Sequence, residues 1–239
     1  MGGKAGKTTA DIATFALDKF EVTVGRFRNF HAAYHGPPAK DAGAHPLIAG
    51  SGWQTSWNGS IAPDAAALDA AVRCDETTQT WTGSASLPMT CVSWFEAFAF
   101  CAWDGGRLPT EAEWEYATAG GTNQLTYAWG DYWAPTYDAT DPYAVYYSPA
   151  VLPVGSKPAG IGRYDQLDLL GSVWEWTLDY YGGYQPDCNN CANLMPGNFR
   201  IHRGGGFSSS YAALTSYGRN EEIPSDHIAS NGFRCARNP

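Results

Sequence analysis

The segment from Gly105 to Ala117 constrains the fold of this chain more than any other stretch. It reads Gly-Gly-Arg-Leu-Pro-Thr-Glu-Ala-Glu-Trp-Glu-Tyr-Ala, so a glycine turn and a proline lead into a Thr-x-x-Glu capping box. In such a box the threonine hydroxyl and the glutamate carboxylate each accept a free backbone N–H of the first helical turn. The segment therefore predicts a Trp- and Tyr-rich helix that begins beside Thr110.

Two further helices are indicated upstream of this one. A second capping box, Ser93 with Glu96, precedes the apolar run 97–103, and a helix that is apolar on nearly every side belongs at the centre of a fold. Residues 15–22 are typical of a strand, and Thr23 then caps a helix whose apolar positions recur at helical spacing. We expect the helix after Thr110 to end at the Gly-Gly pair 120–121.

The rest of the chain shows little periodicity. Residues 36–88 hold many Gly, Pro and Asp residues, and we expect a long loop excursion pinned by Trp53, Trp57 and Trp81. Residues 166–239 alternate short strand-like runs with turns. We expect a flexible segment over 1–13 and a single domain over 14–239. Core roles are expected for five tryptophans: Trp94, Trp103, Trp114, Trp174 and Trp176.

The composition and net charge limit the kinds of partner that the chain could bind. The chain of 239 residues is 44% hydrophobic but only 16% charged, with 27 Gly and 10 Trp, as in a loop-rich domain held by buried aromatic side chains. Its formal net charge of −9, without a basic cluster, argues against nucleic acid as a partner. No apolar run approaches the roughly 20 residues of a transmembrane helix.

Cysteine content indicates the compartment. Six cysteines in an Asn-, Gly- and Ser-rich context favour an oxidising, extracytoplasmic location, whether periplasmic, secreted or lipid-anchored. Residues 1–13 lack the apolar core of a signal peptide. We therefore expect that an export signal or lipid anchor stood upstream of the present start.

Four motifs, in order, resemble those of the formylglycine-generating enzyme family, also called the sulfatase-modifying factor family. They are the segment 105–117, Gly-Ser-Val-Trp-Glu-Trp at 171–176, Arg-Gly-Gly-Gly-Phe at 203–207 and Gly-Phe-Arg-Cys at 232–235. The resemblance covers residues 14–238. It implies an α+β fold, a variant of the C-type lectin fold with a twisted antiparallel sheet, little regular secondary structure and disulfide bonds.

The resemblance does not extend to the cysteines that carry the family's oxidase activity. In those oxidases two thiols between the last two motifs bind copper and activate oxygen, and soft thiolates are the ligands that Cu(I) prefers. Here residues 203–234 contain no cysteine, and Tyr211 and Ser216 stand at the corresponding positions. We therefore expect no copper and no formylglycine production.

The cysteine pairing follows partly from the resemblance. The family joins its helix cysteine, here Cys101, to the cysteine of the last motif, here Cys235. The Cys188-x-x-Cys191 pair is typical of a redox motif, half a metal site or a stapled loop, and we favour the staple because no second pair completes a metal set. Cys74 and Cys91 then remain to pair with each other.

A calcium loop is the metal site that the resemblance implies. Asp168 stands where the family has asparagine, Gly171 and Val173 would supply backbone carbonyls, and Glu175 would supply a carboxylate. Hard cations such as Ca²⁺ prefer oxygen ligands of this kind. The alternative interpretation is an ordinary acidic loop packed by Trp174 and Trp176.

Three functions remain open. The first is a non-catalytic binding or structural module that contacts an unknown protein or small-molecule ligand through the irregular segment 208–231. A variant of it is a lectin-fold variable recognition protein of a diversity-generating retroelement. The second is an oxidoreductase of the formylglycine-generating type, and the third is an enzyme with other chemistry in the same cleft. The expected ligand-contacting residues are Tyr211, Ser216, Tyr217, Arg219, Glu221, Glu222, Asp226 and His227.

Overall fold

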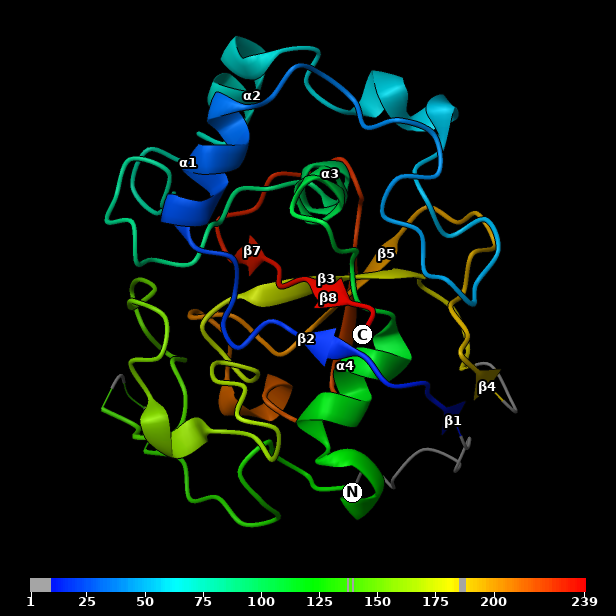
Figure 1. Cartoon of the computed structure of the whole chain (residues 1–239). Helices are drawn as coiled ribbons and strands as arrows, with labels where there is room; N and C mark the ends of the chain where they lie inside the picture. Colours follow the sequence, from blue (N-terminus) through cyan, green and yellow to red (C-terminus); the bar gives the residue numbers. More distant parts are fainter. Residues whose placement is uncertain (1–9, 137, 139, 185–187) are drawn as a thin grey trace.

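The structure is a computed structural model that describes residues 10–136, 138, 140–184 and 188–239. Most of the described chain lies outside helices and strands, as the composition predicts (Figure 1). The α-helices are α1 (Val24–Ala32), α2 (Ala65–Ala71), α3 (Trp94–Trp103) and α4 (Glu111–Thr118). The 3-10 turns are η1 (Thr55–Ser60), η2 (Gly121–Asn123), η3 (Pro158–Gly160) and η4 (Tyr211–Ala213).

A small sheet crosses the middle of the molecule. Its order is β6-β5-β3-β7, with β3 antiparallel to β5 and parallel to β7. In Figure 1, α3 lies above β3 and α4 lies below it. The sheet strands are β3 (Trp174–Tyr180), β5 (Arg200–Arg203), β6 (Arg219–Glu222) and β7 (Asn231–Gly232). Two short pairs complete the set, β1 (Ala10–Asp11) with β4 (Cys188–Asn189) and β2 (Ala16–Leu17) with β8 (Ala236–Arg237).

The helix starts predicted from the sequence are confirmed. Both capping boxes form, Ser93 with Glu96 at α3 and Thr110 with Glu113 at α4, and the Thr23 hydroxyl accepts a hydrogen bond from a backbone N–H of α1. The residues after α4 turn through Gly120 and Gly121, whose φ angles of +66° and +69° favour glycine. The chemistry at each helix end thus fixes where α3 and α4 begin.

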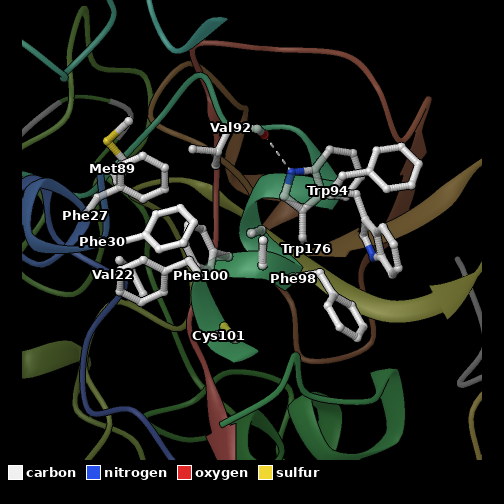
Figure 2. Close-up of a cluster of buried hydrophobic side chains, with 14 of the residues drawn as sticks. Val22, Phe27, Phe30, Met89, Val92, Trp94, Phe98, Phe100, Cys101 and Trp176 are labelled. Atoms are coloured by element: carbon white, nitrogen blue, oxygen red, sulfur yellow. Dashed lines mark hydrogen bonds between the residues drawn. The ribbon is translucent and has the colours of Figure 1, made fainter. Parts of the chain in front are cut away.

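Helix α3 is the centre of the main hydrophobic cluster (Figure 2). Trp94, Phe98 and Phe100 are fully buried on it, and Phe100 stacks on Phe27 of α1 at 5.7 Å between ring centroids. The indole N–H of Trp176 in β3 donates to the Val92 carbonyl at 3.0 Å. Truncating one such buried aromatic side chain to alanine costs roughly 3–5 kcal/mol.

The structure corrects the strand expected over residues 15–22. Only Ala16–Leu17 pair as a strand, the chain bends at residues 19–20, and beyond the bend Glu21 and Val22 are both buried although they are neighbours. A strand that packs one face cannot bury two successive side chains. Of the segment 1–13 that we expected to be flexible, residues 1–9 lie outside the described residues, and Ala10–Asp11 form β1.

The excursion at 36–88 is also more structured than expected. It contains η1 and α2, and Asp64 caps α2 by accepting from the N–H of Ala67 at 2.9 Å. The Ala-rich helix lacks the bulky apolar repeat that would have revealed it. Trp53 and Trp81 are buried as expected, so tryptophans do hold this excursion to the core.

The tryptophan expectations hold for three of the five. Trp94, Trp114 and Trp176 are fully buried and Trp174 is half-buried. Trp103 is 44% exposed and corrects the prediction, because it is the last residue of α3, where its ring contacts Phe30 at 5.6 Å between centroids but remains partly in solvent.

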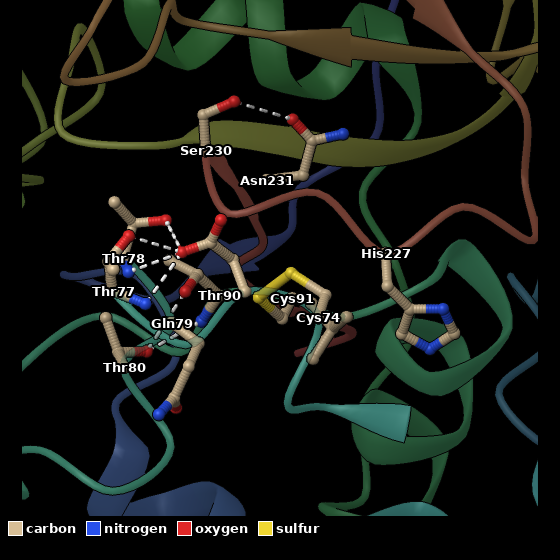
Figure 3. The surroundings of a disulfide bond; sticks show 12 residues. Cys74, Thr77, Thr78, Gln79, Thr80, Thr90, Cys91, His227, Ser230 and Asn231 are labelled. Atoms are coloured by element: carbon tan, nitrogen blue, oxygen red, sulfur yellow. Dashed lines mark hydrogen bonds between the residues drawn. A yellow bond between two sulfur atoms is a disulfide. The ribbon is translucent and has the colours of Figure 1, made fainter. Parts of the chain in front are cut away.

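All six cysteines form disulfides, in the three expected pairs. They are Cys74–Cys91, Cys101–Cys235 and Cys188–Cys191. Figure 3 shows Cys74–Cys91 beside the hydroxyl-rich turn that contains Thr77 and Thr78. The Cys101–Cys235 disulfide ties α3 to the C-terminal end across 134 positions of sequence.

Candidate functional site

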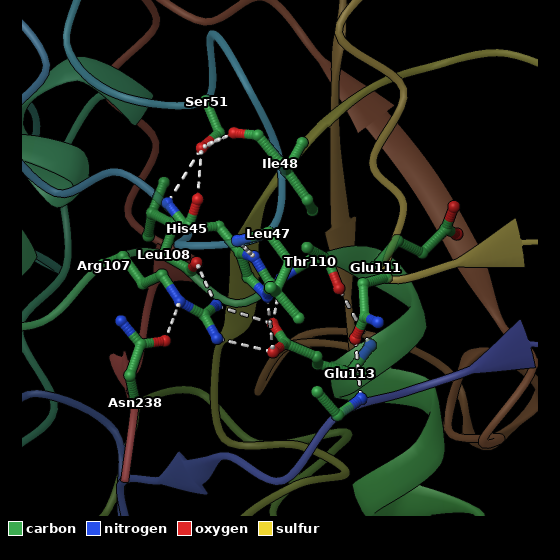
Figure 4. A network of polar contacts seen from close by, with 12 residues as sticks. His45, Leu47, Ile48, Ser51, Arg107, Leu108, Thr110, Glu111, Glu113 and Asn238 are labelled. Carbon is green, nitrogen blue, oxygen red and sulfur yellow. Dashed lines mark hydrogen bonds and ion pairs between the residues drawn. The ribbon is translucent and has the colours of Figure 1, made fainter.

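The start of α4 is held by buried polar contacts (Figure 4). The Arg107 guanidinium donates to both oxygens of Glu113 at 2.7 and 2.6 Å, and the backbone N–H of Thr110 donates to the same carboxylate at 2.9 Å. Although burial acts to raise it, hydrogen bonds from His45 and Arg107 lower the pKa of Glu113 to about 2. The motif 105–117 thus anchors the helix whose other face carries the site.

On that face two glutamates pair with two arginines of the sheet. Arg219 of β6 donates from two nitrogens to Glu111, at 2.8 Å each, and Arg203 of β5 pairs with Glu115. The Arg203 side chain is fully buried and also donates to the carbonyls of Ser216 and Gly218 at 3.0 and 2.9 Å. These contacts tie the segment after Phe207 to α4.

A cavity of about 140 Å³ opens beside this charged group. Its walls come from α4, β4, the end of β3 and β6, and they include Glu111, Glu115, Asp179, Cys191 and Arg219. The oxygens of Asp179 accept the backbone N–H groups of Glu111 and Asn193 at 2.7 Å each. Burial raises the pKa of Asp179 to about 7, with a contribution from the nearby negative charge of Glu111.

The positions of the family's copper thiols do not open into this cavity. Ser216 is 3% exposed. Its hydroxyl donates to the Leu125 carbonyl at 2.6 Å, and its backbone N–H donates to the Thr126 carbonyl. Tyr211 lies in η4 and is 36% exposed. Neither residue lines the cavity beside α4.

Tyr211 and Tyr217 instead gather with a third tyrosine. Burial raises the pKa of Tyr127, and the negative charges that Tyr217 and Tyr211 would carry when ionised raise it further. Tyr217 is 48% exposed, so two phenol groups reach the surface here. Tyr127 also stacks on Trp129 at 5.6 Å between ring centroids. We call Tyr127, Tyr211 and Tyr217 the tyrosine patch.

The remaining expected ligand residues lie in other surroundings. Arg219 faces the cavity beside α4, whereas His227 pairs with Glu96 at the start of α3 at 2.8 Å. Glu221 and Glu222 belong to β6, and Asp226 follows in a turn closed by its own N–H on the Ile223 carbonyl. The expected ligand residues of segment 208–231 are therefore spread over three places: the tyrosine patch, strand β6 with the turn after it, and the start of α3.

Of the four residues expected to hold calcium, two lie around one buried guanidinium, whereas Gly171 and Val173 lie close to Val145. Asp168 and Glu175 flank the Arg234 guanidinium, which donates to both oxygens of Glu175 and to the Asp168 carbonyl. Gly171, with φ +71°, allows the chain to turn between them, where an added Cβ would lie 2.3 Å from the Val145 carbonyl oxygen. Val173 is fully buried directly before β3.

A third carboxylate belongs to this region and was missed from the sequence. Glu21 is 1% exposed, and neither of its oxygens has a hydrogen-bond partner. Burial raises the pKa of Glu21, with further contributions from Asp168 and Glu175. The one available signal was that Glu21 interrupts the apolar pattern of residues 20–22.

Comparison with known proteins matches residues 2–239 to the family "Sulfatase-modifying factor enzyme 1-like domain". A formylglycine-generating enzyme of Thermomonospora curvata is 27% identical over 99% of this chain and 86% of its own length. The inactive C-alpha-formylglycine-generating enzyme 2 of Mus musculus is 33% identical over 63% of this chain, and the match spans 49% of the mouse protein.

Two solved structures share the fold. PvdO from Pseudomonas aeruginosa superposes with a TM-score of 0.64 at 22% identity, covering 94% of this chain and 80% of PvdO. Treponema denticola variable protein 1 superposes with a TM-score of 0.62 at 20% identity, covering 97% and 87%. The chain therefore belongs to the sulfatase-modifying factor enzyme 1-like family and has its C-type lectin-like, disulfide-bonded α+β fold.

Proposed function

We propose that this chain is a binding module on a formylglycine-generating-enzyme-like scaffold, non-catalytic with respect to the formylglycine reaction, which contacts a ligand or partner through segment 208–231. One observation carries the proposal: the chain has no free thiol. All six cysteines are used in disulfides, and residues 203–234 contain no cysteine. The family relative named as inactive is similar over the same domain.

The chemistry of the substituted positions supports this proposal. Cu(I) is held by soft thiolate or thioether ligands, whereas Tyr211 and Ser216 offer hard oxygens. The Ser216 hydroxyl is moreover committed to a backbone carbonyl inside the fold. A copper oxidase would have to recruit the Cys188–Cys191 pair, which lies on β4 and in the turn after it rather than in segment 203–234.

The tyrosine patch is the proposed contact surface. Tyrosine side chains supply a large amphipathic contact area at a low cost in conformational entropy, which is why recognition loops are rich in them. Serine residues 208–210 stand next to Tyr211 in the chain and add hydroxyl groups. Because Arg219 and Glu222 lie on the neighbouring strand β6, a polar partner could be oriented from that side.

A variable recognition protein is the second candidate. The similarity to Treponema denticola variable protein 1 reaches 97% of this chain, although at 20% identity it bears on the fold alone. The exposed Tyr and Ser residues of segment 208–217 favour this candidate. Comparison of the gene among strains tests it, because diversification predicts that codon changes concentrate within 208–231 and spare the buried positions Leu214 and Ser216.

Three carboxylates near Arg234 support the proposal of an oxygen-bound cation. Three carboxylates, Glu21, Asp168 and Glu175, surround one guanidinium, so the region would carry excess negative charge with all three ionised. The Glu175 oxygens already accept from Arg234 and from the Trp114 indole at 2.8 Å. Glu21, with two unpartnered oxygens, and Asp168 are therefore the carboxylates available to a cation.

We propose calcium as that cation, bound by Glu21 and Asp168 with the carbonyls of Gly171 and Val173, while Glu175 holds Arg234 in place. Among the described residues, no three His, Cys, Asp or Glu side chains are grouped as a metal site, so main-chain oxygens would be needed as well. An ion that binds only the folded chain stabilises it.

We further propose an extracytoplasmic location, because three disulfides persist only where the surroundings are oxidising. Among the described residues, no helix combines the length and the apolar character that crossing a membrane requires. The net charge of −9 disfavours nucleic acid as a partner.

Binding to a glycan array and to a peptide library tests the proposed surface. The Tyr211→Ala/Tyr217→Ala double variant should lose at least ten-fold in affinity for any probe that the wild type selects. Tyr132→Ala is the matched control, since Tyr132 is 84% exposed and outside the tyrosine patch. Binding that survives the double variant but fails in the control would place the contact elsewhere.

A further inference from the structure

The Cys188–Cys191 disulfide borders the cavity beside α4. Cys188 lies in β4, which pairs with β1, and both cysteines contribute to the cavity wall. Cys191 is half-buried, so this end of the disulfide is the more accessible one. The Cys101–Cys235 disulfide, by contrast, is fully buried.

This disulfide stabilises the chain least of the three. It closes a loop with a sequence separation of 3, whereas Cys101–Cys235 spans 134. The entropy that a disulfide removes from the unfolded chain grows with loop length, so the shortest loop gives the smallest stabilisation. Its position in the cavity wall is therefore better explained by a reactive role of the disulfide than by stabilisation of the loop.

The same cavity holds a proton acceptor. Asp179 is held by the N–H of Asn193, two residues after Cys191, and its pKa of about 7 lets it gain or lose a proton near neutral pH. The groups that face it are Glu111 and Glu115 of α4, Arg200 of β5, Arg219 of β6 and Tyr184.

The Cys74–Cys91 disulfide lacks a comparable proton acceptor. Cys74 is exposed and has a carboxylate next to it in the chain, Asp75. The Asp75 carboxylate accepts hydrogen bonds from Thr77 and Thr78, which hold its pKa well below the usual range. Asp75 therefore stays ionised near neutral pH and cannot relay a proton.

We infer that Cys188–Cys191 is a thiol–disulfide exchange site, whose substrate is a polypeptide that carries two thiols. A substrate thiolate, its proton taken by Asp179, attacks the Cys191 sulfur, and the Cys188 sulfur leaves and receives that proton. The second substrate thiol gives its proton to Asp179 and attacks the substrate sulfur of the mixed disulfide, and the Cys191 sulfur leaves and receives that proton. The substrate dithiol is oxidised to a disulfide and the protein disulfide is reduced to two thiols. A small disulfide such as oxidised glutathione restores the protein.

The experiment uses the full chain and a synthetic peptide with two cysteines. The oxidised protein is mixed with the reduced peptide, quenched with acid and alkylated, and each protein disulfide is quantified by peptide mass spectrometry. We expect Cys188 and Cys191 to be alkylated first, at least ten-fold faster than Cys74 and Cys91, with equivalent oxidation of the peptide.

Variants distinguish exchange at Cys188–Cys191 from unspecific reduction of any disulfide in the chain. Cys188→Ser/Cys191→Ser should slow peptide oxidation at least ten-fold, whereas Cys74→Ser/Cys91→Ser should leave its rate unchanged. Asp179→Asn should keep the disulfide and slow exchange several-fold, with folding checked by its melting temperature. Equal rates at the Cys188–Cys191 and Cys74–Cys91 disulfides, or peptide oxidation that keeps its rate without Cys188 and Cys191, would overturn the inference.

Discussion

Removing the Cys101–Cys235 disulfide should destabilise the chain more than removing either of the other two. It closes a loop with a sequence separation of 134, and loop-closure entropy for a loop of that size corresponds to about 5 kcal/mol. The same relation gives about 3 kcal/mol for Cys74–Cys91 and about 2 kcal/mol for Cys188–Cys191. The two sulfurs of Cys101–Cys235 join α3 to the residue before β8, so the cross-link constrains more than half of the chain.

Alanine is the appropriate replacement, because Cys101 and Cys235 are fully buried and serine would place two hydroxyls in an apolar cluster. Urea unfolding of the Cys101→Ala/Cys235→Ala variant should show a loss of about 5 kcal/mol in the free energy of unfolding. Cys188→Ala/Cys191→Ala is the matched control. A larger loss in the control than in the Cys101/Cys235 variant would refute the loop-entropy reasoning.

Three further predictions concern the cap, the cation and pH. Thr110→Ala removes the hydroxyl that accepts the Glu113 N–H at 3.1 Å, and chemical unfolding should show a loss of about 1 kcal/mol. Calcium should raise the melting temperature of the wild type and of the exposed control Glu76→Gln but not of Glu21→Gln; equal gains in all three would exclude Glu21 as a ligand. Burial raises the pKa of Asp179 to about 7 from about 4 in the unfolded chain, so the native state binds more protons between these values. Stability should fall as pH rises from 4 to 7, by up to roughly 1.4 kcal/mol per pH unit, and this component should be absent in Asp179→Asn.

Local chemistry explains which elements the sequence predicts. The starts of α3 and α4 follow from capping boxes, in which donors and acceptors lie within three residues. Helix α2 has only an Asp64 cap and a run of alanines, so no apolar repeat distinguishes it from a loop. The strand expected over 15–22 was too long, because pairing with β8 ends at Leu17 and the chain bends at residues 19–20, and the partner strand is distant in sequence.

In the candidate site too, features set by neighbouring residues could be predicted, whereas those that depend on distant residues could not. The positions of Tyr211 and Ser216 could be inferred by counting along the motifs, but the burial of Ser216 depends on Leu125, 91 positions away. Asp179 and Cys191 come together only because Asn193 folds back onto β3. Glu21 joins Asp168 across nearly 150 positions, and no pattern within either segment predicts that meeting.

Copper-dependent conversion of a Cys-x-Pro-x-Arg peptide tests the non-catalytic proposal most directly. The purified chain would be incubated with copper, oxygen and the peptide, beside the Thermomonospora curvata relative as a positive control. Mass spectrometry follows the change from thiol to aldehyde, a loss of about 18 mass units. Because oxygen ligands at Tyr211 and Ser216 cannot replace soft sulfur, we expect an unchanged peptide with this chain. Copper-dependent loss of that mass, above the level of free copper alone, would contradict the proposed function.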